Sequence, residues 1–466
     1  MDIKKLENNI NEFWDKKIIP LLTEYIKIPN KSPSFDPEWE KHGHMDRVLN
    51  LALEWANENK PVGATVSVER TAGRTPIIMV DVPGTKDGNI LMYGHLDKQP
   101  EMDGWEDGLG PWTPVLKNEK LYGRGGADDG YALFASISSI RALKDQEVDH
   151  PRILVLIEFS EESGSPDLPH YMKLCSDKIG TPDLVICLDS GAGDYNRFWT
   201  TTSLRGLIGL SMKVEVLAEG VHSGGASGHV PSSFRISRKL LSKLEDENTG
   251  EVLLEKLHTK IPDHRIKETE NLVDILQDEI VNEFPWKNKM RPSTDDKIEG
   301  VLRRTWKPAL SIVGSDGLPP TENAGNVLRP YTTLQLSMRI PPMVDAKEAK
   351  SEIERVLNEN IPYDATVELK FEEAADGWSA PETKSWLLEA IEKASKQYFG
   401  EPPCSIGEGG TIPFMAMLGE QFPEAQFVIT GVLGPKSNAH GPNEFLHIPF
   451  AKKLTCCISS ILADYK

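Results

Sequence analysis

Short apolar runs that end in acidic or histidine-containing loops most strongly constrain what this chain can fold into. The runs at residues 90–93, 153–159 and 184–188 are apolar almost throughout, which is typical of strands buried on both faces of a sheet. Amphipathic helical patterns accompany them at residues 4–27, at residues 45–59 and directly after residue 130. Buried strands that alternate with such helices predict an α/β fold.

Each of these runs is followed by side chains that carry chemistry. His95 and Asp97 follow the first run, Glu161 and Glu162 the second, and Asp189 the third. Ligand sites in open α/β sheets gather beyond the carboxyl ends of the strands, so we expect these side chains to lie close together. His95 and Asp97 point the same way in an extended backbone, so the carboxylate can hold one ring nitrogen while the other binds a metal.

Asp128 and His440 extend this set from two further loops. Asp128 and Asp129 precede an amphipathic helix, and His440 follows an apolar strand predicted at residues 426–432. Two imidazoles with several carboxylates and no cysteine suit Zn, Mn or Co. Carboxylates at this density would repel one another without a cation, so convergence and metal binding depend on each other. The alternative is that each residue acts separately; Asp128, for example, would simply cap the helix.

The pattern of the chain changes near residue 204. It predicts alternating strands at residues 207–217, 331–340 and 366–372, with helices at 232–244 and 346–358. We therefore predict an α+β domain, residues 204–380, inserted into a first domain made of residues 1–203 and 381–466. The charged segment 246–306 has helical patterns near residues 252–257 and 272–284, and its role is open.

Charge and composition exclude several classes of partner. The formal net charge of −19 argues against nucleic acid and anionic membranes, which both require a basic surface. No apolar run approaches the roughly 18 residues of a membrane span, and the charged N-terminal residues do not form a secretory signal, which favours the cytoplasm. The five cysteines form no C-x-x-C pair, so we expect mostly buried thiols rather than disulfides or zinc ligands.

Other catalytic signatures are absent from the sequence. It contains no H-E-x-x-H, no G-x-S-x-G and no G-x-x-x-x-G-K-[ST] motif. Gly123-Arg124-Gly125 starts like a dinucleotide-binding loop, but the third glycine is missing.

A series of motifs carries a family resemblance from about residue 90 to the C-terminus. In chain order the motifs are Tyr93-Gly94-His95-Leu96-Asp97, Leu121-Tyr122-Gly123-Arg124-Gly125, Ala127-Asp128-Asp129, Glu161-Glu162-Ser163-Gly164-Ser165, Val221-His222-Ser223-Gly224, Ser337-Met338-Arg339, Glu408-Gly409-Gly410-Thr411 and Ala439-His440-Gly441-Pro442-Asn443-Glu444. Together they resemble the dinuclear metallopeptidases of family M20, which include aminoacylase, carboxypeptidase G and succinyl-diaminopimelate desuccinylase. The cytosolic dipeptidase and carnosinase branch is the most similar.

The resemblance implies a role for each metal-site residue. His95 and Asp189 would bind one divalent ion, Glu162 and His440 a second, and Asp128 would bridge the two. Asp97 would orient His95, and Glu161 would be the general base. The family uses zinc most often, with Mn²⁺ or Co²⁺ as alternatives. The implied fold is a catalytic domain with a mostly parallel sheet flanked by helices, interrupted by an inserted ferredoxin-like domain that acts as a lid and in dimerisation.

The resemblance also implies residues that contact the substrate. His222 resembles the family's oxyanion-stabilising histidine, which often reaches the partner subunit's site in a homodimer. Arg339 resembles the residue that binds the substrate's carboxylate, and Asn326, Gly410 and Thr411 are further candidate contacts. A bidentate arginine suits a substrate with a free carboxylate, such as a small peptide.

These expectations favour a metallo-dipeptidase and leave two alternatives. An N-acyl amino acid amidohydrolase would share every metal ligand, and a substrate panel separates the two. A non-catalytic binding protein would require the loss of a ligand or of the base, and none is lost. One departure bears on substrate preference: the dipeptidase pattern Asp-Asp-Lys-Gly is replaced by Asp128-Asp129-Gly130-Tyr131.

Overall fold

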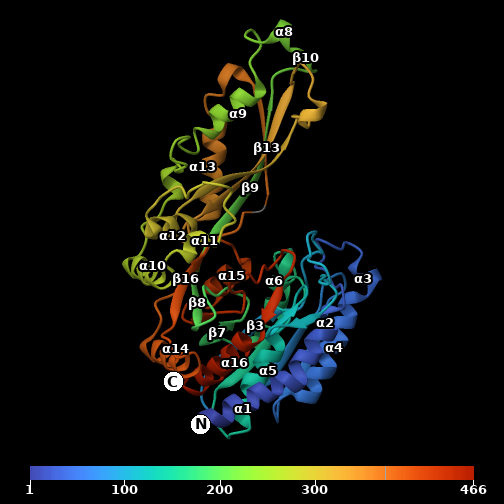
Figure 1. Ribbon diagram of the computed structural model, residues 1–466, viewed down its shortest axis with the longest axis vertical. Coiled ribbons are helices and arrows are strands. Elements are labelled where there is room, and N and C mark those ends of the chain that lie inside the picture. Colours follow the sequence, from blue (N-terminus) through green and yellow to red (C-terminus); the bar gives the residue numbers. More distant parts are fainter. Residues whose placement is uncertain (373) are drawn as a thin grey trace. The chain divides into compact units, whose positions relative to one another are not determined.

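The computed structural model describes residues 1–372 and 374–466 and divides them into two compact units. The first unit contains residues 1–202, 380–406 and 417–466, and the second contains residues 203–379 and 407–416. Figure 1 shows the elements of both units, which are described separately below.

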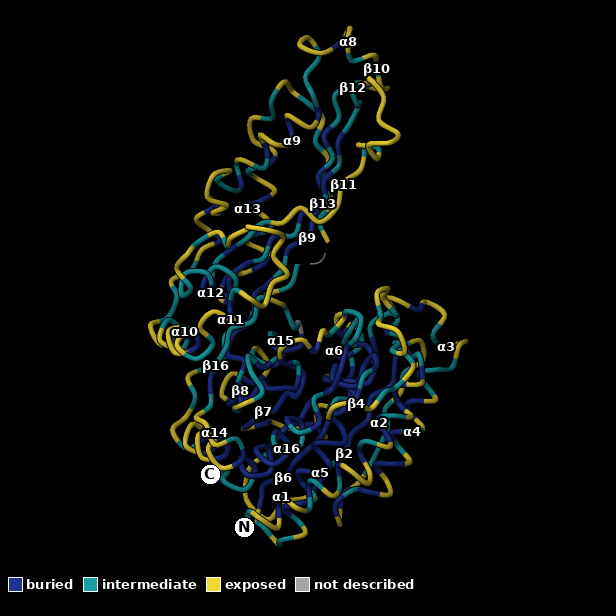
Figure 2. The backbone as a smooth tube through the Cα atoms, viewed as in Figure 1, coloured by how far each residue is buried: buried dark blue, intermediate teal, exposed yellow. Residues whose placement is uncertain are grey.

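The first unit is built on a large mixed sheet. Seven of its strands, in spatial order, are β1 (Thr65–Glu69), β2 (Ile77–Val82), β6 (Arg152–Glu158), β3 (Asn89–His95), β7 (Leu184–Cys187), β17 (Gln426–Ile429) and β8 (Trp199–Leu204), and the short strands β15 (Trp378–Ser379) and β16 (Cys404–Glu408) both pair with β8. Strands β6, β3, β7 and β17 run parallel, whereas β1, β2 and β8 join antiparallel at the two sides. The sheet is therefore mixed rather than mostly parallel, because the flanking strands are not reached by helical crossovers. The four parallel strands are buried almost throughout (Figure 2).

Helices pack on this sheet and on one another. The principal ones are α1 (Ile3–Phe13), α2 (Ile19–Ile26), α4 (His44–Asn59), α5 (Ala132–Lys144), α14 (Ser385–Tyr398) and α16 (Ile448–Ala463). The predicted helix at residues 4–27 is thus α1 and α2, joined by a π-helical turn at Trp14–Ile18. The buried Trp14 donates to Thr455 Oγ1 at 3.0 Å, and Ser459 Oγ donates to the carbonyl of Ser139 at 3.0 Å, so hydrogen bonds hold α16 to the π-helical turn and to α5.

Shorter elements complete the first unit. They are α3 (Trp39–His42), α6 (Leu168–Leu174), α7 (Ser176–Ile179), β16 (Cys404–Glu408), whose last two residues belong to the second unit, and a small sheet of β4 (Val115–Lys117), β5 (Lys120–Tyr122) and β18 (Phe445–His447). Helix α15 (Pro413–Gln421) also crosses the boundary between the units. All five cysteines are buried thiols, as expected. Among the described helices, none combines the length and the apolar character that a membrane span requires.

The second unit contains a four-stranded antiparallel sheet. Its order is β11 (Ala309–Asp316), β13 (Tyr331–Ile340), β9 (Gly206–Glu215) and β14 (Thr366–Phe371). Every second residue of β13 is buried, and these side chains form a core with α9 (Ser233–Leu241) and α13 (Ala346–Asn358). A two-stranded tip pairs β10 (Val221–His222) with β12 (Val327–Leu328), next to α8 (Ser223–Ala226). Strand β15 (Trp378–Ser379) pairs antiparallel with the last residues of β8.

The segment 246–306 folds into short helices within the second unit. These are α10 (Asp263–Leu276), α11 (Glu279–Asn282) and α12 (Lys297–Thr305). The helix predicted near residues 252–257 is wrong, since only a 3₁₀ turn forms there, at Glu255–Leu257. The apolar spacing there has another cause: the segment buries Val252, Leu254 and Leu257 although it does not form an α-helix.

The two compact units differ from the sequence-based division in one segment. Residues 407–416 lie in the second unit, although the sequence assigned them to the first domain because they follow residue 381. The reason is a local set of hydrogen bonds: Thr411 Oγ1 donates to the carbonyl of Arg205 at 2.5 Å, and Arg205 Nε donates to the carbonyl of Gly409 at 3.2 Å.

Candidate metal centre

Three neighbouring parallel strands deliver the candidate ligands to one edge of the sheet. His95 is the last residue of β3, Glu161 and Glu162 lie in the 3₁₀ turn that follows β6, and Asp189 lies just beyond β7. Strand β3 pairs with both β6 and β7 in parallel, so the carboxyl ends of all three strands meet. The structure thus brings together side chains that are far apart in sequence.

Asp128 lies between the two histidines. Its Oδ1 is 3.3 Å from Nε2 of His95, and its Oδ2 is 2.9 Å from Nε2 of His440. Nε2 of His440 is also 3.3 Å from Oε2 of Glu162. Asp128 is buried, whereas the His440 side chain is exposed and its backbone takes a left-handed conformation (φ 63°). Each carboxylate oxygen of Asp128 therefore faces a different imidazole, which is the arrangement of a bridging ligand.

His95 lies at the centre of the remaining carboxylates. Its fully buried Nε2 is 3.8 Å from Oδ2 of Asp189 and 4.0 Å from Oε2 of Glu161. Two triads can each bring one ligand atom per residue within 4.8 Å of one another: His95 with Glu161 and Asp189, and His95 with Asp128 and Glu162. The first triad allows Glu161 to be either a ligand or a base.

Asp97 contacts the site in two ways, of which the sequence indicated only one. Its Oδ1 lies 3.4 Å from Nδ1 of His95, and the same ring nitrogen lies 3.2 Å from the backbone carbonyl oxygen of Asp97, to which it can donate. Its two oxygens also accept the backbone N–H groups of Glu161, at 3.1 Å, and Glu162, at 3.0 Å. Asp97 therefore positions the turn that carries the glutamate pair as well as the imidazole.

Crowded carboxylates give the site its electrostatic character. Burial and the charge of Asp189 raise the pKa of Glu161 well above its usual value, and burial and Asp128 do the same for Glu162. Burial, opposed by His95 and reinforced by Asp128, raises the pKa of Asp189 to about 6. Burial alone would lower the pKa of His95, but the surrounding carboxylates raise it well above its usual value. The site holds an excess of negative charge that a cation would relieve.

The donor set fits divalent metal ions. Imidazole nitrogens and carboxylate oxygens are ligands for Zn, Mn and Co, and cysteine is absent from the cluster. Donors for more than one ion are present because His95 lies at one oxygen of Asp128, while His440 lies at the other oxygen and also contacts Glu162.

Supporting residues that the sequence reasoning left without a role surround these ligands. Gln99 Nε2 donates to Oε2 of Glu162 at 2.6 Å. The buried Arg124 binds the buried Glu444 at 2.6 Å, and Oε1 of Glu444 accepts the backbone N–H of Gly125 at 3.0 Å. Arg124 belongs to the motif directly before that of Asp128, and Glu444 belongs to the motif of His440, so motif membership was the signal that could have found them.

The second unit holds the predicted substrate contacts in two separate places. Arg339, on β13, donates from Nη1 to Thr411 Oγ1 at 2.9 Å, and Gly410 precedes Thr411 in the same loop. His222 and Asn326 lie together at the exposed tip, where the N–H of Ser223 donates to the carbonyl of Asn326 at 2.9 Å. Nδ1 of His222 accepts the N–H of Gly224 at 3.1 Å.

Comparisons with known proteins agree on one group of relatives. A family model described as Peptidase family M20/M25/M40 matches residues 91–464. The cysteinylglycine-S-conjugate dipeptidase of Corynebacterium striatum is 26% identical over 391 residues, which are 81% of this chain and 82% of that protein. The Beta-Ala-His dipeptidase of Rattus norvegicus is 25% identical over 432 residues, 88% of this chain and 85% of that protein.

One solved structure shows how far the fold agrees. The di-peptidase Dug1p from Saccharomyces cerevisiae aligns with a TM-score of 0.78 at 20% identity, covering 100% of this chain and 98% of that one. At this identity the structural likeness concerns the fold alone.

Proposed function

Because this chain belongs to peptidase family M20/M25/M40, we propose that it hydrolyses the amide bond of dipeptides or short peptides that carry a free C-terminal carboxylate. It is a metal-dependent hydrolase, and the relatives that match most of its length are named dipeptidases. The observation that carries the proposal is the cluster in which Asp128 lies between His95 and His440, with Glu161, Glu162 and Asp189 around it.

We assign the ligands of two divalent ions within this cluster. His95 and Asp189 hold one ion, Glu162 and His440 hold the other, and Asp128 bridges them; the short contacts of both Asp128 oxygens support this division. Zinc is the proposed metal, with Mn²⁺ or Co²⁺ as alternatives. When bound, such ions lower the pKa of a water and polarise the scissile carbonyl.

Glu161 is the proposed general base. Its carboxylate accepts a proton from the attacking water and then delivers it to the nitrogen of the leaving amine. Burial and Asp189 raise its pKa, which makes it a stronger base than an exposed glutamate. Asp97 holds the backbone N–H of Glu161 at 3.1 Å, so the base extends from a fixed turn. In the family motif, the first glutamate of the pair is the base and the second is a metal ligand. This order supports Glu161 as the base rather than as a third ligand.

Residues of the second unit are proposed to recognise the substrate. Arg339 binds the terminal carboxylate through a bidentate contact, and its hydrogen bond to Thr411 supports a fixed orientation for this guanidinium. Gly410 and Asn326 are further proposed contacts. His222 is proposed to donate to the oxyanion that forms at the scissile carbonyl.

We further propose that the second unit is a ferredoxin-like lid and dimerisation domain and that the protein is a homodimer. Strand β11 supports this because it is an edge strand whose residues are largely exposed, including Ile312 and Val313. An open edge of this kind can pair with a second copy. The cytoplasmic location stays a prediction from the sequence.

Mixing two inactive variants tests the dimer and the reach of His222. If His222 acts in the partner's site, Glu161→Gln and His222→Ala subunits that exchange form heterodimers with one complete site. The mixture should then recover about a quarter of wild-type activity. No recovery after verified subunit exchange would show that His222 acts only within its own subunit.

Metal analysis combined with a substrate panel tests the function itself. The purified protein should contain close to two divalent ions per subunit and should hydrolyse dipeptides faster than tripeptides and N-acyl amino acids. Preferential hydrolysis of N-acyl amino acids would favour the amidohydrolase alternative. Full metal content without hydrolysis of any panel member would indicate a binding protein.

A further inference from the structure

Arg205 is a buried arginine to which neither the motifs nor the proposed mechanism assigns a role. It lies between β8 and β9, and only 8% of its surface is exposed. Among the described residues, no carboxylate lies within ion-pair distance of its guanidinium; its hydrogen-bond acceptors are backbone carbonyls. Nε donates to Gly409 at 3.2 Å, and Nη1 donates to Arg303 and Lys307 at 3.4 Å each. A buried charge satisfied only by dipoles is costly, so a specific role is expected.

The carbonyl acceptors of Arg205 join two segments that are distant in sequence. Arg303 belongs to the last turn of α12 and Lys307 follows that helix, where the helix dipole favours a positive charge. Gly409 belongs to the loop that carries Gly410 and Thr411. A Cβ at position 409 would lie 2.9 Å from the carbonyl oxygen of Arg304 and 3.1 Å from Nη2 of Arg205, so the loop packs directly against both.

A short chain of hydrogen bonds then leads from Arg205 to Arg339. The Thr411 hydroxyl donates to the carbonyl of Arg205 at 2.5 Å and accepts from Nη1 of Arg339 at 2.9 Å. Because a hydroxyl has one proton, its donation to Arg205 leaves its lone pairs free to accept from Arg339. The position of Arg205 thus determines how Thr411 presents its oxygen to the guanidinium of Arg339.

Charge adds to this mechanical link. Burial lowers the pKa of Arg205 to about 10, and repulsion from the nearby positive charges of Arg339 and Arg304 contributes to this shift. Arg304 is compensated by Glu283 at 2.7 Å, whereas Arg205 and Arg339 have no carboxylate partner among the described residues. An anion that binds at Arg339 would relieve this repulsion.

We propose that Arg205 is the positioning residue of the carboxylate-binding site: it fixes the loop Gly409–Thr411 to the end of α12, holds Thr411 on Arg339, and adds positive potential for the carboxylate of the substrate. This deepens the proposed function and rests on Arg339 binding that carboxylate. It also gives the segment 246–306 a role, since α12 becomes the support against which the binding loop is set.

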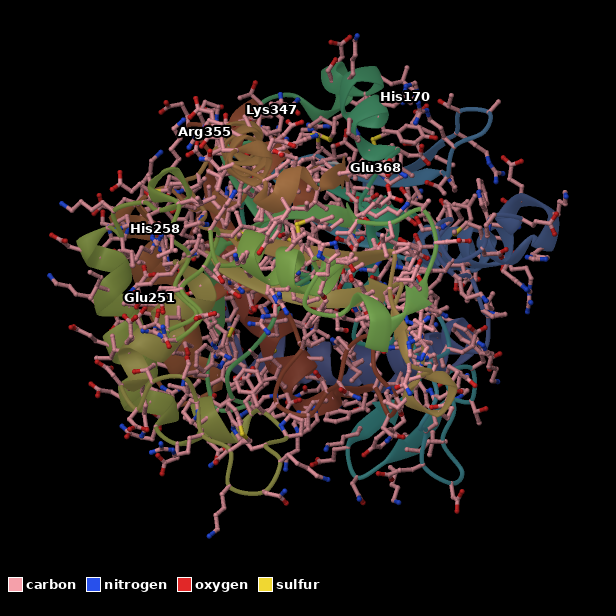
Figure 3. All side chains as sticks on the ribbon, turned by 90° about the horizontal axis from the view of Figure 1, so that it is seen from above. His170, Glu251, His258, Lys347, Arg355 and Glu368 are labelled. Carbon is pink, nitrogen blue, oxygen red and sulfur yellow. The ribbon has the colours of Figure 1, made fainter. Side chains whose placement is uncertain are left out.

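The kinetic test compares a dipeptide acid with its C-terminal amide. In Arg205→Gln, KM for the acid should rise about 10- to 100-fold, because Arg339 loses its fixed partner and the site loses a positive charge, while KM for the amide and the metal content change little. Arg205→Lys keeps the charge but loses the planar guanidinium, so its KM for the acid should lie between the values of the wild type and of Arg205→Gln. The matched control is Arg355→Gln, an exposed arginine on α13 (Figure 3).

Hydrogen exchange gives a test that does not depend on activity. The amides of residues 407–412 should exchange faster in Arg205→Gln than in the wild type or in Arg355→Gln. Thr411→Val, which leaves the buried charge in place, should raise the acid KM without that broad loss of protection. In the double variant of Thr411→Val and Arg205→Gln, the free-energy change that corresponds to the rise in the acid KM should be smaller than the sum for the two single variants.

The outcomes separate this inference from the proposed function. Unchanged exchange at residues 407–412 in a folded Arg205→Gln variant overturns the positioning role, whatever the substrate proves to be. An unchanged acid-to-amide ratio with faster exchange overturns the link to carboxylate binding. Failure of the wild type to hydrolyse any dipeptide counts against the proposed function, and the exchange result then still decides whether Arg205 positions the loop.

Discussion

The metal centre of the first unit and the tip of the second unit are built in opposite ways. Around the metal centre, His95, Asp97 and Asp128 are buried at the ends of packed elements, and several polar groups hold each of them. At the tip, His222 and Asn326 are exposed on a two-stranded ribbon. The difference teaches that contacts within the chain arrange the candidate ligands in advance, whereas the proposed substrate or second subunit would have to complete the surroundings of His222 and Asn326.

Replacement of Asp128, the proposed bridging ligand, should have the largest effect on metal content and on activity. In Asp128→Asn, the oxygen pair that faces both histidines is lost, so metal content should fall below one ion per subunit and hydrolysis should disappear. Metal analysis and a dipeptide assay measure both. Normal metal content with normal activity would show that Asp128 is not the shared ligand.

Glu161→Gln should separate chemistry from metal binding. We expect kcat to fall by about 10²- to 10⁴-fold because the proton acceptor is lost, while metal content stays close to two ions per subunit. Glu368→Gln, an exposed glutamate on β14 (Figure 3), is the control and should behave like the wild type. A parallel loss of metal in Glu161→Gln would instead identify Glu161 as a ligand, as the triad with His95 and Asp189 allows.

His222→Ala tests the opposite end of the comparison. Loss of a donor to the oxyanion should lower kcat by about 10²- to 10³-fold without changing metal content, because the exposed side chain makes its hydrogen bond within the tip, to the N–H of Gly224. The control is His264→Ala, an exposed histidine on α10. If kcat is unchanged, the tip has no part in the chemistry.

Glu408 should give the smallest effect and one that concerns stability alone. Burial raises the pKa of this half-buried carboxyl from 4.5 to about 7, so the folded protein holds a proton that the unfolded chain releases. Its contribution is therefore present at low pH and is lost as pH rises from about 4.5 through 7. After allowance for partial exposure, the loss is about 1–3 kcal/mol.

Denaturation at pH 5 and pH 8 measures this term. The glutamine side chain at position 408 cannot ionise in the Glu408→Gln variant. The free energy of unfolding of this variant should therefore fall less between pH 5 and pH 8 than that of the wild type, by the contribution of Glu408. An identical decline in variant and wild type would mean that Glu408 titrates normally.

The buried strands were predictable because burial on both faces leaves a continuous apolar run. Residues 153–159 and 184–188 show this directly, and β6 and β7 form there. Strand β11 was missed because it is an edge strand with an exposed face, so its residues show no regular alternation. The placement of residues 407–416 in the second unit depends on hydrogen bonds to Arg205, which no local pattern contains.

The convergence of the candidate site was predictable from topology, but its supports were not. Parallel strands must end at the same edge, so the meeting of His95, Glu161 and Asp189 follows from the order of strands and loops. The contacts of Asp97 with two backbone N–H groups depend on how the turn after β6 approaches β3. Backbone donors have no sequence signature, so this second role could not be read from a His-x-Asp motif.

The buried pair of Arg124 and Glu444 has a consequence for the order in which the molecule is made. It joins residues 320 positions apart and ties the loop of Asp128 to the loop of His440. During synthesis from the N-terminus, the first loop therefore waits for its partner until 320 further residues have been translated. The candidate metal centre is therefore completed only after the strands of the large sheet have been made, and a ribosome-bound chain that stops before residue 440 should fold much of that sheet without retaining two ions.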